Sequence, residues 1–277
     1  MKSYLRWLED ILDGGQDSDD RTGTGTIRLT GSMFSHDMSK GFPLVTTKFM
    51  ATKAIVGELI WFMRGCTNVE KLREITHGKD SDKWVIWDPN YNKQAKELGY
   101  SGGYLGPVYG KQWRDSFGTD QLQNAIDMIK NDPTSRRIIV TSWNPAELDL
   151  MALPPCHFAF QFLVNGDKLD LVWYQRSVDS FLGLPFNIAS YGLMLEIVAQ
   201  ITGKTPGRLV GMGADCHIYK DHLDQVREQV SRQPLELCKL NIKKDIKSLG
   251  DMYKVGVDDF EFVDYRCHAP LKGKMSA

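Results

Sequence analysis

The clearest structural signal in the sequence comes from three consecutive stretches: FAFQFLV (158–164), NGD (165–167) and KLDLVWY (168–174). In the first stretch aromatic and aliphatic residues recur at every second position, which predicts a β-strand with one buried face. Asn-Gly is typical of tight hairpin turns, and the alternation resumes directly after it. The three stretches therefore predict an antiparallel hairpin, with Phe158, Phe160, Phe162 and Val164 on one face of its first strand.

On both sides of this hairpin, apolar residues recur with helical periodicity in several separate segments. We expect helices over 4–12, 51–63, 121–130, 190–202 and 222–231, and another strand over 137–143. Residues 66–104 and 232–260 have the weakest patterns and are interpreted as surface excursions. Hairpins combined with separate helices favour an α+β fold, a mixed or antiparallel sheet with helices packed on one face. We expect one domain over residues 1–277.

Composition excludes several classes of protein. The 277 residues are 42% hydrophobic and 25% charged, as in ordinary globular chains, and the net charge is −1. A basic surface that coats nucleic acid is not expected, and no DNA partner is predicted. No segment reads as membrane-spanning, and acidic residues occupy the place of a signal peptide's apolar run. Five widely spaced cysteines indicate reduced thiols and a cytoplasmic location.

The neighbouring sequence makes two residues, Cys156 and Glu58, candidates for a catalytic role. Cys156 follows Pro154-Pro155 at the start of a strand; it is either a buried structural cysteine or a nucleophile. A nucleophile needs a nearby cation, which its sequence neighbours do not supply, and His157 points to the opposite face. Glu58 lies on an apolar helix beside Trp61 and Phe62, where desolvation would raise its pKa and suit it to acid–base work. The alternative, a surface Glu paired with Lys or Arg, is equally compatible.

Polar residues also gather between a strand and an apolar helix. The stretch 174–187 contains Arg176, Ser177, Asp179 and Asn187, in the kind of position where ligand-binding groups collect. DRTGTGT (20–26) is similar to a phosphate loop but matches no standard phosphate motif, so a plain glycine turn is the alternative. His217 and Tyr219 share one face of an extended segment. No CxxC or HExxH spacing occurs, and no metal is expected.

Eight motifs occur in order along the chain, and together they resemble the thymidylate synthase family from Tyr4 to the C-terminus. They are DRTGTGT (20–26), FPLVTTK (42–48), ELIWF (58–62), LGPVYGKQWR (105–114), SRRIIVTSWNP (135–145), ALPPCH (152–157), WYQRSVDSFLGLPFNIASY (173–191) and HIY (217–219).

The resemblance implies reductive methylation of dUMP at C5, with 5,10-methylenetetrahydrofolate as co-substrate. It implies that Cys156 is the thiolate that attacks uracil C6 and that Arg176 is the missing cation. Glu58 would relay protons, and Tyr109 would assist removal of the C5 proton. Asn187 would accept from uracil N3–H and donate to O4, a pattern that cytosine reverses.

Further binding roles are implied by the same resemblance. Arg21, Arg176 and Ser177 would hold the phosphate, joined across a two-fold interface by Arg136 and Arg137 of the partner subunit, so the protein would be a homodimer whose sheet forms the interface. The remaining implied contacts are Gln175 for the nucleotide, His217 and Tyr219 for the sugar, Asp179 for the pterin, Ile86, Trp87, Leu182, Gly183 and Phe186 for folate packing, Lys48 for the glutamate tail and Ser276 in the closing C-terminal tail.

The chain departs from the family pattern at Ser180, Ala214 and Cys216, and in its polar end at Ser276-Ala277. If water reached the exocyclic methylene before hydride, the product would be 5-hydroxymethyl-dUMP, so a pyrimidine nucleotide hydroxymethylase is the alternative function. A non-catalytic nucleotide- or RNA-binding relative is a second alternative. The joint presence of Cys156, Glu58, Tyr109 and Asn187 argues against binding alone, which needs no nucleophile.

Overall fold

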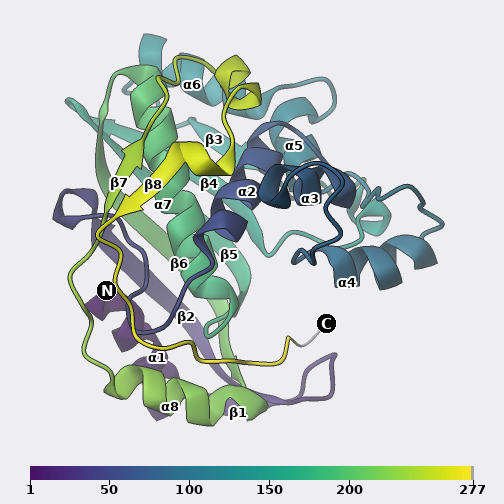
Figure 1. Cartoon of the computed structure of the whole chain (residues 1–277), viewed down its shortest axis with the longest axis vertical. Coiled ribbons are helices and arrows are strands. Elements are labelled where there is room, and N and C mark those ends of the chain that lie inside the picture. The colour runs from purple at the N-terminus through teal and green to yellow at the C-terminus, as the bar shows by residue number, and fades with distance from the viewer. Residues whose placement is uncertain (276–277) are drawn as a thin grey trace.

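The computed structural model describes residues 1–275, and its centre is a six-stranded sheet (Figure 1). All neighbouring strands are antiparallel except β5 and β6, which are parallel. This confirms the predicted mixed sheet of an α+β fold. In spatial order the strands are β1 (Gln16–Ser18), β2 (Thr26–Asp37), β6 (Thr205–Tyr219), β5 (Lys168–Asp179), β4 (His157–Asn165) and β3 (Ile139–Thr141).

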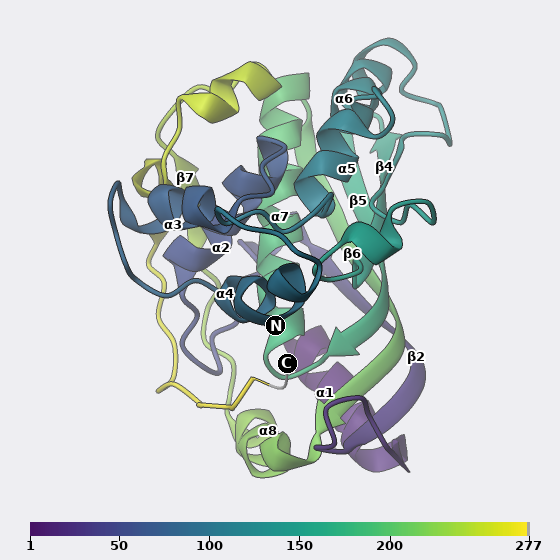
Figure 2. The ribbon, with the colours of Figure 1, turned by 90° about the vertical axis from the view of Figure 1, so that its right-hand side faces the viewer.

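Helices cover one face of this sheet (Figures 1 and 2). Helix α1 packs on β2, α7 on β5 and β6, and α6 on β3 and β4. The helices are α1 (Lys2–Gly14), α2 (Thr52–Met63), α3 (Val69–His77), α4 (Asp88–Asn90), α5 (Tyr109–Asp115), α6 (Gln121–Asn131), α7 (Gly183–Thr202) and α8 (Leu223–Ser231), and strands β7 (Lys239–Ile242) and β8 (Phe260–Val263) form a separate pair.

The hairpin of β4 and β5 forms as predicted, except at its first residues. Asn165 pairs with Lys168 across the turn, and Phe160 and Phe162 are buried. A β-bulge between His157 and Ala159 shifts the alternation by one position. Phe158 consequently lies beside Tyr174, with ring centroids 6.5 Å apart, and not with the buried aromatic residues. The prediction for Phe158 is wrong for this reason.

Three other element boundaries also differ from the prediction. Strand β3 covers only 139–141 of the expected 137–143, because this edge strand pairs with β4 over three residues. Strand β5 continues to Asp179, five residues beyond the predicted end at Tyr174. Helix α7 begins at Gly183 and not at 190. Its start is stabilised by the Asp179 carboxylate, which accepts from the amides of Phe181 and Leu182. Pro185 is tolerated because it lies in the first helical turn.

The two weakly patterned segments are more structured than expected. In 66–104, Asn68 caps α3 by accepting from two amides, and Leu72 and Trp87 are buried. The prediction of a surface excursion is therefore wrong for this part of the chain. In 232–260, strand β7 pairs with β8 (Figure 1).

Helix α7 is the central core helix. It is long and apolar enough to span a membrane by length and composition alone, but 72% of that window is buried inside the fold. The opposite face of the sheet is not covered by these helices. It presents side chains that alternate with buried neighbours and are 37% to 61% exposed: Met33, Ile139, Leu163 and Met212.

Candidate active site

Cys156 lies immediately before β4, where two prolines hold the backbone extended. Its amide donates to the hydroxyl of Tyr109 over 2.8 Å, which connects the loop before β4 to the start of α5. The thiol faces a cation that the neighbouring sequence could not supply. Arg176 of β5 places Nη2 4.0 Å from Cys156 Sγ.

Two hydrogen bonds to main-chain carbonyls fix the orientation of the Arg176 guanidinium. Its Nε donates to the carbonyl of Pro155 over 2.9 Å, and its Nη2 donates to that of Pro154 over 3.0 Å. The guanidinium also lies over the ring of Trp143, 5.5 Å from the centroid. Burial raises the pKa of the Cys156 thiol, and the Arg176 charge opposes this rise. The resulting pair is a sulfur atom beside a fixed positive charge, which is the setting of a nucleophilic cysteine.

His157 lies on the helix side of the sheet. Its ring stacks on Tyr109 with centroids 4.3 Å apart, and its Nδ1 is 2.8 Å from the hydroxyl of Tyr191. Burial lowers the pKa of His157 to about 3, so its ring is neutral at physiological pH. The imidazole packs against Tyr109 and does not form a dyad with Cys156. This agrees with the prediction that His157 points to the opposite face of the strand from Cys156.

Glu58 is a desolvated carboxyl on α2. Burial raises its pKa to about 7, while a hydrogen bond from Nε1 of Trp87 over 2.7 Å acts in the opposite direction. Of the two interpretations left open by the sequence, the structure supports the desolvated acid–base group. Trp87 was expected only to pack on folate. Its bond to Glu58 had no sequence signal, because the residues are 29 positions apart.

Asn187 extends from the second turn of α7 and is oriented by two successive side-chain hydrogen bonds. Trp173 Nε1 donates to Gln175 Oε1 over 3.2 Å, and Gln175 Nε2 donates to Asn187 Oδ1 over 3.2 Å. The amide orientation of Asn187 leaves its Nδ2 as a donor for a ligand. Gln175 is 4% exposed, so in this structure its visible role is to orient Asn187.

The loop that carries Arg21 is organised by Asp20. One carboxylate oxygen accepts from the amide and hydroxyl of Thr22, and the other accepts from Gly25 N over 2.6 Å. These bonds lower the pKa of Asp20. Arg21 itself is exposed at the tip. The loop is therefore a preorganised turn that presents a cation, which is more than a plain glycine turn.

Strand pairing brings this loop to the other predicted nucleotide contacts. Thr26 pairs with Tyr219, and across the parallel strands Asp179 pairs with His217. His217 Nδ1 is 3.0 Å from Asp215 Oδ1. Burial raises the pKa of Tyr219 to about 12, and the charges of Asp179, Asp20 and Arg21 act on it as well. Ser177 lies on the same end of β5, opposite Asp215.

The residues expected to bind folate lie around the start of α7 and in 84–87. Leu182, Gly183 and Phe186 surround the first turn, with the Asp179 carboxylate capping it. Ile86 is 42% exposed and Trp87 4%. Lys48 is 3% exposed, and its ammonium contacts Phe181. Ser276 lies outside the described residues.

Arg136 and Arg137 are exposed before β3 and do not approach Cys156 within the chain. Gln161 Nε2 donates to the carbonyl of Arg136 over 3.1 Å. Gln161 lies further along β4 than His157, the residue next to Cys156. The pairing of β3 with β4 therefore places Arg136 and Arg137 further along the sheet than Cys156.

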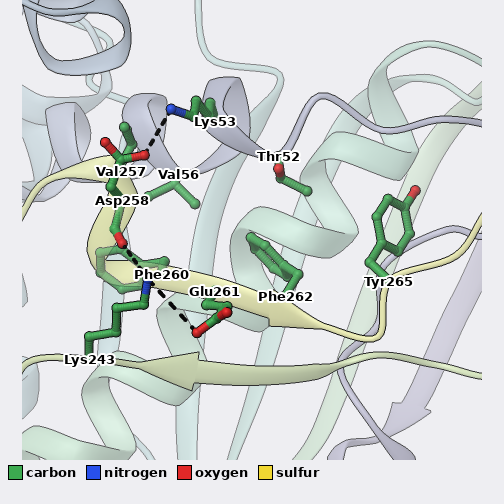
Figure 3. Close-up of a pocket in the computed structure, with 10 residues that line it drawn as sticks. All are labelled: Thr52, Lys53, Val56, Lys243, Val257, Asp258, Phe260, Glu261, Phe262 and Tyr265. Carbon is green, nitrogen blue, oxygen red and sulfur yellow. Dashed lines mark hydrogen bonds and ion pairs between the residues drawn. The ribbon is translucent and has the colours of Figure 1, made fainter.

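Two other features do not add to this site. Within residues 1–275, no group of three or more His, Cys, Asp or Glu side chains is gathered as a metal ion would require. A hollow of about 280 Å³ lies between the start of α2 and β8 (Figure 3) and contains none of the predicted site residues. Its lysines are paired: Lys53 with Asp258 over 2.8 Å, and Lys243 with Glu261 over 3.8 Å.

Comparison with known proteins gives one answer over the full length. Residues 2–277 match the family model described as thymidylate synthase. The chain is 50% identical to the thymidylate synthase of Enterobacteria phage T4, 50% to the probable thymidylate synthase of Escherichia phage T5 and 46% to that of Mycoplasma mobile, with 100% of each chain covered.

The fold agrees with this result. The crystal structure of thymidylate synthase from T4 phage superposes with a TM-score of 0.96 over 100% of both chains, at 50% identity. The relatives' names favour methyl transfer over the hydroxymethylase alternative. The chain belongs to the thymidylate synthase family.

Proposed function

We propose that Cys156 is the nucleophile of a thymidylate synthase reaction, with Arg176 as its cation. The reaction transfers the methylene group of 5,10-methylenetetrahydrofolate to C5 of dUMP. Sulfur adds to C6, and C5 then bonds to the methylene carbon and loses its proton. Tetrahydrofolate leaves and returns a hydride to the exocyclic methylene, which yields dTMP and dihydrofolate and releases Cys156. The fixed Arg176 guanidinium 4.0 Å from Cys156 Sγ carries this assignment.

The other groups divide between proton transfer and binding. Tyr109 assists removal of the C5 proton, and the hydrogen bond that its hydroxyl accepts from the Cys156 amide supports this role. Glu58, with a pKa of about 7, exchanges protons readily at neutral pH and suits the relay to O4 and to the folate amine. Asn187, oriented by Gln175, reads the uracil edge. Arg21, Arg176 and Ser177 hold the phosphate, and His217 and Tyr219 hold the sugar. Asp179, Ile86, Trp87, Leu182, Gly183 and Phe186 form the folate side.

The chain acts as a single domain in a cytoplasmic homodimer. Apolar side chains on the uncovered sheet face, among them Met33 and Met212, supply a surface that a second copy would bury. Arg136 and Arg137 would then complete the partner's phosphate site. All five cysteines are free, in keeping with a reducing compartment.

Product analysis with Cys156→Ser tests this proposal. Wild type is expected to give dTMP and dihydrofolate in equal amounts by mass spectrometry. Cys156→Ser is expected to lose turnover and keep dUMP binding, since the hydroxyl is a far weaker nucleophile at neutral pH. Undiminished turnover would remove Cys156 from the mechanism. A 5-hydroxymethyl product with unoxidised tetrahydrofolate would identify the hydroxymethylase instead.

A further inference from the structure

Helix α3 (Val69–His77) belongs to the weakly patterned segment 66–104, and it packs against α2 next to Glu58. A Cβ added at Gly57, the residue before Glu58, would lie 2.2 Å from Oγ1 of Thr76 on α3. Thr76 is 4% exposed, and its hydroxyl donates to a carbonyl of its own helix. Because position 57 has no side chain, the two helices approach closely beside the buried carboxyl.

The same helix holds the loop that leads to Trp87. Nε of Arg73 donates to the Lys83 carbonyl over 3.0 Å, and its Nη2 donates to Oδ1 of Asp88. The other carboxylate oxygen of Asp88 accepts from the amide of Val85 over 2.8 Å. One guanidinium on α3 therefore contacts both ends of the loop. Since Asp88 directly follows Trp87, these contacts fix the backbone from which the indole extends.

The ion pair of Arg73 with Asp88 is largely buried, with both side chains 12% exposed. Nη1 of Arg73 donates to Glu70, so all three guanidinium nitrogens are engaged. A buried ion pair is a poor source of net stability, because lost hydration offsets the attraction. Its effect here is geometric: α3 contacts the helix of Glu58 and also holds the loop of Trp87. These are the residues that share the 2.7 Å hydrogen bond from Nε1 to Oε1.

We propose that Arg73 is a positioning residue for proton transfer and that it acts through Trp87. Its ion pair with Asp88 holds the indole N–H on the Glu58 carboxylate. This inference rests on the proposed role of Glu58 as a proton relay. Tyr109 of α5 also interacts with the charge of Glu58, but burial raises the pKa of Tyr109 and keeps it protonated at neutral pH. Loss of Arg73 therefore weakens a donor that stabilises the carboxylate, and the pKa of Glu58 rises.

Arg73→Met tests this, because it keeps an unbranched chain and removes the donors. The pKa of Glu58 is measured directly from the infrared carbonyl band of its protonated form, identified by subtracting the spectrum of Glu58→Gln. It should rise by about 0.5 to 1 unit, since one hydrogen bond to a charged group is weakened or lost. Lys71→Met is the matched control, because it removes one charge from an exposed lysine of α3 that pairs with Glu74. It should leave the pKa of Glu58 unchanged. An unchanged pKa in Arg73→Met overturns the proposal.

A second substitution shows whether Arg73 acts through the indole. Arg73→Met/Trp87→Phe is expected to have the Glu58 pKa of Trp87→Phe alone, because the N–H that Arg73 positions is already lost. A further rise in the double variant would mean that the guanidinium charge acts on Glu58 directly, which overturns the proposal. If Arg73→Met does not fold, Asp88→Asn tests the other side of the ion pair. It should raise the same pKa, and no rise there contradicts the proposal.

The pH dependence of kcat separates this inference from the proposed function. In Arg73→Met its midpoint should move to higher pH together with the directly measured pKa of Glu58. A pKa that rises while the midpoint stays in place would keep the role of Arg73 and overturn Glu58 as the proton relay. A midpoint that moves while the pKa stays in place would overturn the role of Arg73.

Discussion

The indole Nε1 of Trp87 donates to Oε1 of Glu58 over 2.7 Å, so a residue from a weakly patterned segment stabilises the charged form of a desolvated carboxyl. Burial alone favours the protonated form of Glu58, and the indole donor stabilises the carboxylate. The balance is a pKa of about 7. Both forms of Glu58 are populated at neutral pH, as a proton relay requires.

Trp87→Phe should raise the pKa of Glu58 further, because the ring remains and the N–H is lost. A bond of this kind to a charged group corresponds to about one pKa unit. The midpoint assigned to Glu58 in the pH dependence of kcat should therefore move to higher pH by about that amount. A midpoint that stays in place or moves to lower pH would show that the indole does not stabilise the carboxylate.

Glu58→Gln should stabilise the fold at high pH. The pKa of Glu58 in the folded state lies above its usual value of 4.5, so protonation favours folding below pH 4.5 and this contribution is lost as the pH rises to 7. The neutral amide avoids that loss, so the free energy of unfolding should increase by about 3 kcal/mol at pH 8.5. Urea unfolding at pH 4 and pH 8.5 measures this, with the exposed Glu97→Gln as control. An equal effect at both pH values would contradict it.

Asp20→Ala should weaken nucleotide binding by disordering the loop that presents Arg21. The variant removes the carboxylate oxygens that accept from the amides of Thr22 and Gly25. The Kd for dUMP, measured calorimetrically without folate, should rise roughly tenfold. Asp19→Ala, at the exposed neighbouring residue, serves as the comparison and should keep the wild-type Kd. Equal Kd values for the two variants would leave Asp20 without this role.

Much of the fold could be predicted where side-chain alternation is intact. The strands β4 and β5 of the hairpin have this alternation in their sequences, whereas the long central strand β6 lacks it. Its inward positions include Gly211, where an added Cβ would lie 2.2 Å from Trp173. The indole on the neighbouring strand fills the space that an apolar side chain of β6 would occupy. A glycine in that position carries no hydrophobic signal, although the strand is central.

The sequence could nominate candidate residues for the site, but it could not predict the contacts between them. Local sequence left Cys156 without a cation, and the strand pairing of β4 with β5 is what brings Arg176 alongside. The bond from Trp87 to Glu58 and the bond from Lys48 to Phe181 both join segments that are remote in sequence. Such contacts depend on tertiary packing, for which periodicity and motif spacing contain no information.

Mixing two inactive variants should test the shared site. Arg137→Ala removes a partner contribution, and Cys156→Ser removes the nucleophile. In a mixed dimer, one site would combine an intact Cys156 with an intact Arg137 from the other chain. Activity is expected to return after the two variants are unfolded and refolded together. A mixture of Arg137→Ala with a chain carrying both substitutions contains Cys156 but no intact Arg137, and it should stay inactive. Recovery in that mixture, or no recovery in the first one, would contradict sharing.

The most direct measurement is the site of covalent attachment to the nucleotide. With 5-fluoro-dUMP and 5,10-methylenetetrahydrofolate, the fluorine at C5 cannot leave as a proton does, so the adduct should accumulate. Peptide mass spectrometry should find nucleotide and folate attached at Cys156 in wild type and in Cys66→Ser, and no adduct in Cys156→Ser. An adduct on another cysteine, or turnover of dUMP by Cys156→Ser at the wild-type rate, would contradict the account.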